Sequence, residues 1–143
     1  LSKNLKLACH MFSEHDIQPV FEMINGTDMP RFLVQNIAQA QEMLEAVQHP
    51  ALKMQYDCYH MAMMGEDVLQ GLQENIQAIG HIQFADCPGR HEPDTAQIMY
   101  ANIFEWLQHS SYDGFIAAEY RPKTVSTQSF AWKAKYFAAH PQS

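Results

Sequence analysis

The chain has 143 residues, an apolar fraction of 47% and a formal net charge of −7 at pH 7. This length is enough for one domain with its own core. The acidic balance argues against a protein whose main task is to grip phosphate backbones, because that task needs a basic face, and we expect no nucleic-acid partner.

The hydrophobic pattern predicts one helix followed by four strand–helix units. Helical spacing of apolar residues falls at 5–17, 32–47, 66–79, 100–108 and 129–139, with Gly80 expected to cap the third of these helices. Short apolar runs predict strands at 19–25, 52–56, 81–86 and 115–120. Strands that alternate with helices predict parallel right-handed crossovers. No linker or low-complexity segment interrupts residues 1–143, which are therefore expected to form a single unit.

An acceptor side chain stands near the end of each predicted strand: Glu22, Asp57, Gln83 and Glu119. The ends of parallel strands are where α/β folds place their chemistry, so we expect these four side chains to converge. Three carboxylates and an amide oxygen suit a hard divalent cation such as Mg²⁺ or Mn²⁺ better than zinc.

Four strands do not close a parallel barrel, which needs eight. An open flavodoxin-like sheet would fit the length, but it gathers its ligands near one switch point. Here all four strands contribute, as they do around a ring. We therefore predict an α/β fold in which this chain is the C-terminal half of a (β/α)8 TIM barrel, strands 5 to 8, with the N-terminal half absent.

The segments FEMINGTDMPRF, MQYDCYHM, HIQFADCPGRHEPDTAQI and AAEYRP resemble later segments of the hydroxypyruvate isomerase family. That family belongs to the xylose-isomerase-like barrel superfamily, which also holds sugar epimerases and an endonuclease branch. The resemblance covers nearly the whole chain. It implies a metal site formed by Glu22, Asp57, Gln83 and Glu119. Epimerase relatives carry His at the position of Gln83, and the hydroxypyruvate isomerase branch holds its metal weakly or dispenses with it.

The resemblance also implies a reaction, the interconversion of hydroxypyruvate and tartronate semialdehyde (2-hydroxy-3-oxopropanoate). Glu22 and Glu119 would transfer the proton through an enediol(ate). Such carboxyls need a pKa raised by burial or like charge. Other short sugar acids or ketoses, for example 2-oxotetronate, are alternative substrates, and a catalytically inactive barrel fragment is a third alternative. The endonuclease branch is disfavoured by the acidic balance and by Gln83.

Three further residues are predicted to contact the small hydroxy- or oxo-acid substrate. His60, expected at the strand end or in the loop after it, would hydrogen-bond a substrate oxygen, or else be a structural histidine. Arg90 would bind the substrate carboxylate, or else pair with Glu92 on the surface. Glu92 would orient Arg90 or His91.

The sequence also gives expectations for the cellular compartment and the oligomeric state. No apolar run approaches the roughly 20 residues that span a bilayer, and the start lacks a signal-peptide pattern. Cys9, Cys58 and Cys87 are odd in number and scattered, which favours reduced thiols in a cytoplasmic protein, a nucleophilic Cys58 or Cys87 being the alternative. Open strand edges and an exposed half of an apolar interior predict a homo-oligomer or aggregate.

Overall fold

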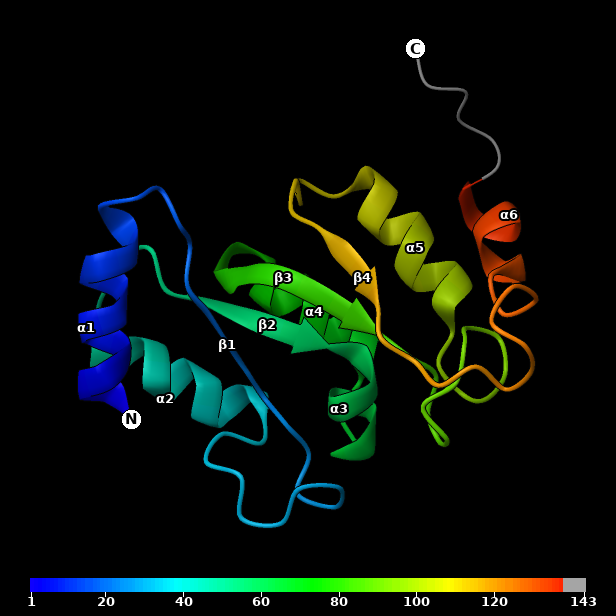
Figure 1. Ribbon diagram of the computed structural model, residues 1–143, viewed down its shortest axis with the longest axis horizontal. Coiled ribbons are helices and arrows are strands. Elements are labelled where there is room, and N and C mark those ends of the chain that lie inside the picture. Colours follow the sequence, from blue (N-terminus) through cyan, green and yellow to red (C-terminus); the bar gives the residue numbers. More distant parts are fainter. Residues whose placement is uncertain (138–143) are drawn as a thin grey trace.

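The computed structural model describes residues 1–137, and its elements follow the predicted order (Figure 1). The strands are β1 (Val20–Glu22), β2 (Lys53–Asp57), β3 (Ile79–Phe84) and β4 (Ile116–Ala118). The helices are α1 (Ser2–Ser13), α2 (Ile37–Val47), α3 (Cys58–Met63), α4 (Val68–Asn75), the 3₁₀ turn η1 (Ile76–Ala78), α5 (Tyr100–His109) and α6 (Ala131–Phe137). Among these, no helix combines the length and apolar character needed to cross a membrane.

The four strands form one parallel sheet in the order β1-β2-β3-β4. Neighbours in sequence are thus neighbours in the sheet, and the order never reverses. This is the arrangement of a barrel segment, whereas a doubly wound sheet contains a switch point. Within the described residues β1 and β4 each pair with a single strand, so the sheet is open at both edges.

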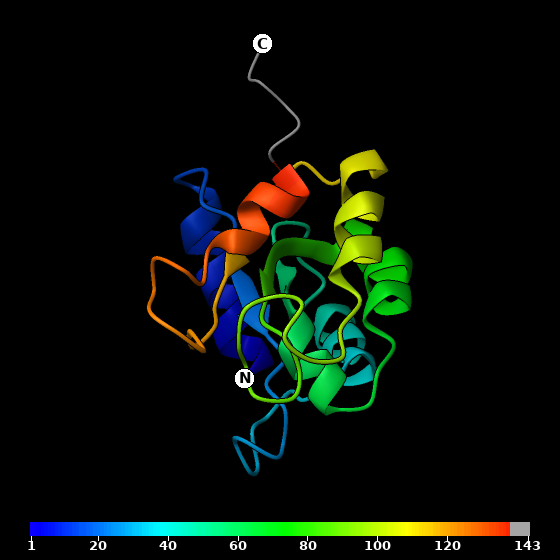
Figure 2. The same ribbon diagram turned by 90° about the vertical axis from the view of Figure 1, so that its right-hand side faces the viewer.

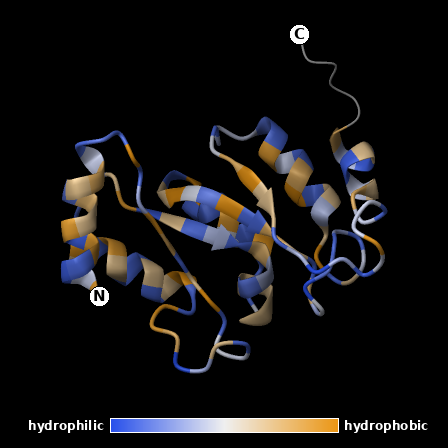
Figure 3. Ribbon diagram, in the orientation of Figure 1, coloured by the Kyte–Doolittle hydropathy of each residue, from blue (hydrophilic) through white to orange (hydrophobic). Residues whose placement is uncertain are grey.

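The two faces of the sheet differ in character. Figure 2 shows α2, α4 and α5 on one flank of the strands, and buried side chains from these helices join the strands in the core. Met54, Tyr56, Ile82 and Phe84 are the buried strand residues of β2 and β3 on this face. The alternate residues of the same strands are half-buried and mostly polar, namely Lys53, Gln55, His81 and Gln83. Figure 3 shows this mixture of hydrophilic and hydrophobic residues along the strands.

The expectation of an exposed apolar interior is wrong for β2 and β3, although Val20 and Ala117, in register with Lys53 and Gln83, are apolar residues of the same face. Glu22 pairs in register with Gln55, which pairs with His81, and Asp57 pairs with Gln83. Residues in register on parallel strands share a face, so the uncovered face carries a polar row rather than an apolar one.

Two local predictions differ from the structure, and part of a third is not tested by it. Helix α2 begins at Ile37 instead of residue 32, because the Asn36 side chain accepts a hydrogen bond from the Gln39 N–H at 2.9 Å and caps the helix there. Gly80 lies inside β3 and caps no helix. A Cβ at that position would lie 2.7 Å from the Cβ of Lys53, so the close approach of β2 and β3 requires glycine. The predicted helical residues 138 and 139 lie outside the described residues.

Helix α3 was not predicted. The Asp57 Oδ1 atom accepts a hydrogen bond from the Tyr59 N–H at 2.8 Å, and this cap starts a helix directly at the end of β2. His60 therefore lies on a helix and not in a loop. The cap also fixes the Asp57 side chain, since one of its two oxygens is committed to the backbone.

Candidate active site

Three of the predicted residues lie together at the carboxyl ends of β1 and β2. Ligand atoms of Glu22, Asp57 and His60 all lie within 4.8 Å of one another, the one such group of three or more in residues 1–137. The His60 Nε2 atom is 3.8 Å from Glu22 Oε1 and 4.0 Å from Asp57 Oδ2. Of the four side chains predicted to converge, Glu22 and Asp57 do so in this group.

Glu119 is linked to the group of Glu22, Asp57 and His60 by Arg90. The Arg90 Nη2 atom donates to Glu119 Oε2 at 2.7 Å and lies 3.5 Å from Asp57 Oδ2. The guanidinium also stands over the Tyr59 ring, 5.1 Å from its centre. Arg90 therefore connects the end of β2 with the residue that follows β4.

These side chains open onto one cavity of about 610 Å³. Its lining includes Glu22, His60, Arg90 and Glu119 of the predicted set, and adds Asp28, Tyr59 and Arg121. Asp57 is fully buried behind this lining. A cavity of this volume is in the range of small-molecule sites.

Two predicted residues are not brought to the cavity. The Gln83 side-chain oxygen accepts a hydrogen bond from Gln55 Nε2 at 2.5 Å, on the polar face of the sheet. The Glu92 carboxylate accepts from the Lys123 N–H at 2.9 Å. It makes no hydrogen bond or ion pair with Arg90, which pairs with Glu119, or with His91, whose Nδ1 donates to the Arg121 carbonyl at 2.7 Å. The structure therefore gives no support to Glu92 as an orienting group, nor to the alternative Arg90–Glu92 pair.

Two carboxyls at the strand ends, those of Asp57 and Glu22, have raised pKa values. Burial raises the pKa of Asp57 to about 7, and its Oδ2 atom has no hydrogen-bond partner. Burial also raises the pKa of Glu22, and the charge of Glu119 acts in the same direction against the opposing effects of Gln55 and Arg90. Raised values are what an exchange of protons near neutral pH requires.

His60 is held as a neutral imidazole with a defined tautomer. The Asn25 Oδ1 atom accepts from the N–H groups of Thr27 at 3.1 Å and Asp28 at 2.8 Å, so the Asn25 amide nitrogen must face the other way. That nitrogen lies 2.6 Å from His60 Nδ1, which is therefore the acceptor. The ring proton sits on Nε2, toward Glu22 and Asp57. Burial lowers the pKa of His60 to about 4, which keeps the ring uncharged.

Sequence reasoning missed the partners of His60. Asn25 was predicted only as the last residue of the first strand, with no functional role, yet its side chain is fully buried. Asp28 accepts hydrogen bonds from Asn25 Nδ2 at 3.0 Å and from the Tyr59 hydroxyl at 2.8 Å, and these bonds lower its pKa. The motif FEMINGTD contained both residues, but only the fold places the segment against α3.

Arg90 owes its position to another residue that the sequence did not single out. The buried Asp86 carboxylate accepts hydrogen bonds from four backbone N–H groups, at 2.8–3.0 Å, on Cys87, Thr95, Ala96 and Ile98. Asp86 thus closes the loop that carries Arg90, which itself adopts a left-handed φ of 56°.

The site fits a divalent cation in part. The unpartnered, buried Oδ2 of Asp57 beside the Glu22 carboxylate is the kind of oxygen pair that Mg²⁺ or Mn²⁺ binds. Glu22 and Asp57 would hold the ion, with His60 adjacent. Gln83 and Glu119 are engaged by Gln55 and Arg90 respectively.

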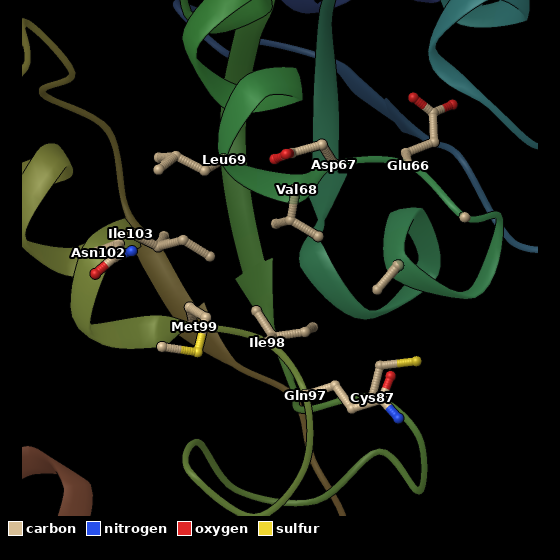
Figure 4. A pocket seen from close by; sticks show the side chains of 12 residues that line it. Glu66, Asp67, Val68, Leu69, Cys87, Gln97, Ile98, Met99, Asn102 and Ile103 are labelled. Carbon is tan, nitrogen blue, oxygen red and sulfur yellow. The ribbon is translucent and has the colours of Figure 1, made fainter.

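A second cavity, of about 420 Å³, lies between the start of α4 and the start of α5 (Figure 4). Val68, Leu69, Ile98 and Met99 line it, with Glu66 and Asp67 at one end. None of the predicted catalytic residues reaches it. All three cysteines are buried free thiols, and Cys87 lines this second cavity instead of the polar one.

The chain belongs to the xylose isomerase-like TIM barrel family, which matches residues 1–136. The expected fold class is confirmed, and the parallel four-stranded sheet is part of such a barrel.

Comparison with curated proteins agrees with the family assignment. A 2-oxo-tetronate isomerase of Cupriavidus necator is 35% identical over 94% of this chain and 52% of that protein. A hydroxypyruvate isomerase of Escherichia coli is 35% identical over 95% of this chain and 53% of that protein. The chain thus spans about half the length of the curated relatives it matches.

Solved structures show the same fold. A family 2 AP endonuclease from Brucella melitensis superposes with a TM-score of 0.89 at 29% identity, over 94% of this chain and 52% of that one. A 3-keto-D-glucoside 4-epimerase from Escherichia coli superposes with a TM-score of 0.81 at 22% identity, over 94% of this chain and 52% of that one.

Proposed function

We propose that this chain carries the proton-transfer site of an isomerase that interconverts hydroxypyruvate and tartronate semialdehyde. The observation that supports it is the pair Glu22 and Glu119 on one cavity, with the neutral Nε2–H imidazole of His60 at its wall. A 35% identical hydroxypyruvate isomerase from Escherichia coli supports the same substrate class.

The reaction moves two hydrogens within one three-carbon acid. One glutamate removes a proton from the hydroxymethyl carbon of hydroxypyruvate, and the electron pair moves to the carbonyl oxygen to give an enediolate. The second glutamate delivers a proton to the former carbonyl carbon. The proton of the terminal hydroxyl passes to the enediolate oxygen on that neighbouring carbon, so the terminal carbon becomes the aldehyde and the former carbonyl becomes a hydroxyl group. His60 donates its Nε2–H to the oxygen on which negative charge develops.

The cation has a supporting role in this proposal. Mg²⁺ or Mn²⁺ held by Glu22 and Asp57 supplies electrostatic stabilisation of the enediolate oxygens when bound. Arg90 keeps the Glu119 carboxylate at the cavity by its 2.7 Å bond.

A second candidate substrate is a 2-oxo-tetronate, since a 2-oxo-tetronate isomerase of Cupriavidus necator is also 35% identical to this chain. Both candidates are short 2-oxo acids, and both reactions use the same transfer between neighbouring carbons. A DNA substrate is disfavoured, because Glu22, Asp28 and Glu119 give the cavity three carboxylates.

A product-resolved assay tests the proposal. The longest natural form of the protein is incubated in D₂O with hydroxypyruvate, with 2-oxotetronate and with dihydroxyacetone, with Mg²⁺ or with a chelator, and the products are identified by NMR. We expect aldehyde formation with deuterium at the proton-accepting carbon for at least one of the two acids. Absence of both isomerisation and exchange with every substrate would remove the proposed function.

A further inference from the structure

The structure points to Arg121, and not Arg90, as the residue that selects a carboxylate-bearing substrate. We propose that Arg121 binds the substrate carboxylate, while Arg90 positions Glu119. This inference rests on the proposed function for its reaction, but the binding preference can be measured without turnover.

Arg90 is already committed to protein carboxylates. It donates to Glu119 at 2.7 Å, lies 3.5 Å from the Asp57 oxygen that has no hydrogen-bond partner, and stacks over Tyr59. An incoming anion would have to displace Glu119 to use this guanidinium, and would thereby release the carboxylate that the reaction needs. Arg90 is thus placed to hold Glu119 at the cavity.

Arg121 lines the same cavity and is available. Its side chain makes no ion pair or hydrogen bond with any residue in the described range 1–137. Its backbone, by contrast, is fixed on both sides. The Arg121 N–H donates to the Arg90 carbonyl at 2.7 Å, and its carbonyl accepts from His91 Nδ1 at 2.7 Å. An exposed guanidinium on a fixed backbone is a suitable anchor, because only the side chain has to be ordered on binding.

The charges around the cavity direct an anion to this place. Glu22 and Asp28 on the β1 side and Glu119 on the β4 side repel a substrate carboxylate. With Arg90 paired to Glu119, Arg121 is the remaining cation among the lining residues. A planar guanidinium binds a carboxylate through two parallel hydrogen bonds, which discriminates an acid from a neutral ketose of equal length.

The test compares Arg121→Ala, Arg121→Lys and Arg90→Ala with the unmutated protein. Tartronate, a stable dicarboxylate, is titrated calorimetrically, and kinetics are measured with hydroxypyruvate and with dihydroxyacetone, which has a hydroxymethyl group in place of the carboxylate. We expect Arg121→Ala to weaken tartronate binding and to raise KM for hydroxypyruvate by about tenfold to a hundredfold, the effect of losing a charge-assisted hydrogen bond. Arg121→Lys should restore part of the loss. Arg90→Ala should instead lower kcat for both substrates by similar factors.

The control is Lys123→Ala, which removes one positive charge from the same segment without touching the cavity lining. It should leave tartronate binding within twofold. Tartronate binding that is absent from the unmutated protein, or equal in Arg121→Ala, would overturn the assignment. So would a loss of the acid preference in Arg90→Ala alone, which would make Arg90 the anchor. If no acid is turned over but tartronate binding still depends on Arg121, the proposed reaction fails while this inference stands.

Discussion

The amide nitrogen of Asn25 lies 2.6 Å from Nδ1 of His60, and this contact decides which ring nitrogen of His60 carries the proton. The Asn25 amide cannot turn over, because its oxygen accepts from the N–H groups of Thr27 and Asp28. A side chain in the segment that follows β1 therefore determines which nitrogen of a histidine on α3 donates and which accepts. The relationship is testable because aspartate keeps the oxygen acceptor and removes the donor.

Asn25→Asp should move the His60 proton from Nε2 to Nδ1. The new carboxylate accepts at the point where the amide donated, so it favours Nδ1–H. The ¹⁵N chemical shifts of the His60 ring report the tautomer directly, and kcat should fall by about tenfold or more while KM changes little. Asn36→Asp, which preserves the cap of α2, is the matched control. An unchanged Nε2–H signal in Asn25→Asp would contradict the assignment.

Glu22→Gln and Glu119→Gln should each abolish proton transfer while the fold remains. The amide keeps the size and hydrogen-bonding oxygen of the side chain but cannot accept or deliver the proton. We expect losses of roughly 10²- to 10⁴-fold in kcat and in solvent deuterium exchange, with the thermal midpoint nearly unchanged. Glu45→Gln on α2 is the control for loss of one charge. Substantial turnover in either site variant would remove that glutamate from the acid/base pair.

The buried Asp57 and His60 side chains should give opposite slopes of stability against pH in the metal-free protein. The pKa of Asp57 is raised from 3.8 to about 7, so the folded state keeps a proton that the unfolded chain loses, and stability decreases as pH rises between these values. The pKa of His60 is lowered from 6.5 to about 4, so the unfolded chain binds a proton that the folded state excludes, and stability decreases as pH falls between these values.

Asp57→Asn should therefore leave the His60 contribution to the pH dependence of stability unopposed. The free energy of unfolding is measured by urea denaturation with a chelator present, for this variant and for Asp57→Asn/His60→Gln. Between pH 6.5 and pH 4 the value for the single variant should fall by about 2 to 3 kcal/mol more than the value for the double variant. The unmutated protein should show a flatter profile, since the two effects oppose each other. Parallel curves for the single and double variants would refute the proposed burial of a neutral His60.

Asp86→Ala should destabilise the loop that carries Arg90. Four backbone N–H groups would lose their acceptor, and an unsatisfied buried group costs about 1 to 3 kcal/mol before the structure relaxes. We expect a loss of about 2 to 4 kcal/mol in the free energy of unfolding and faster hydrogen exchange at residues 86–98. Asp113→Ala, at an exposed position, should change stability by less than about 0.5 kcal/mol. Equal effects of the two variants would show that Asp86 does not hold the loop.

Self-association of the isolated chain should proceed through the open strand edges. The Glu119 N–H donates to the Phe84 carbonyl, so the N–H of the preceding Ala118 faces away from β3. Sedimentation equilibrium should show concentration-dependent association, and Ala118→Pro should weaken it because proline removes the outward donor. A monomer at all concentrations would exclude association of this kind.

The sequence predicted the parts of this protein that depend on local patterns. Apolar runs located the four strands, and family motifs located Glu22, Asp57 and Glu119 at their ends. What escaped prediction depends on contacts between distant segments. Asn25 became a partner of His60 only when residues 35 positions apart were brought together. The pairing of Arg90 with Glu119 required a left-handed backbone at Arg90 and a loop closed by Asp86, neither of which leaves a periodic signal.

The polar row on the uncovered side of the sheet has a consequence for how a barrel of this kind is put together. Water can solvate Glu22, Gln55, His81 and Gln83 directly, so little is gained by hiding them. Pairing with further strands would then be favoured mainly by backbone hydrogen bonds at the open edges of β1 and β4. Such bonds specify the register and orientation of the added strands. A complementary half of such a barrel would consequently be recognised by its backbone. Side chains on the polar face could then change without preventing the two halves from pairing.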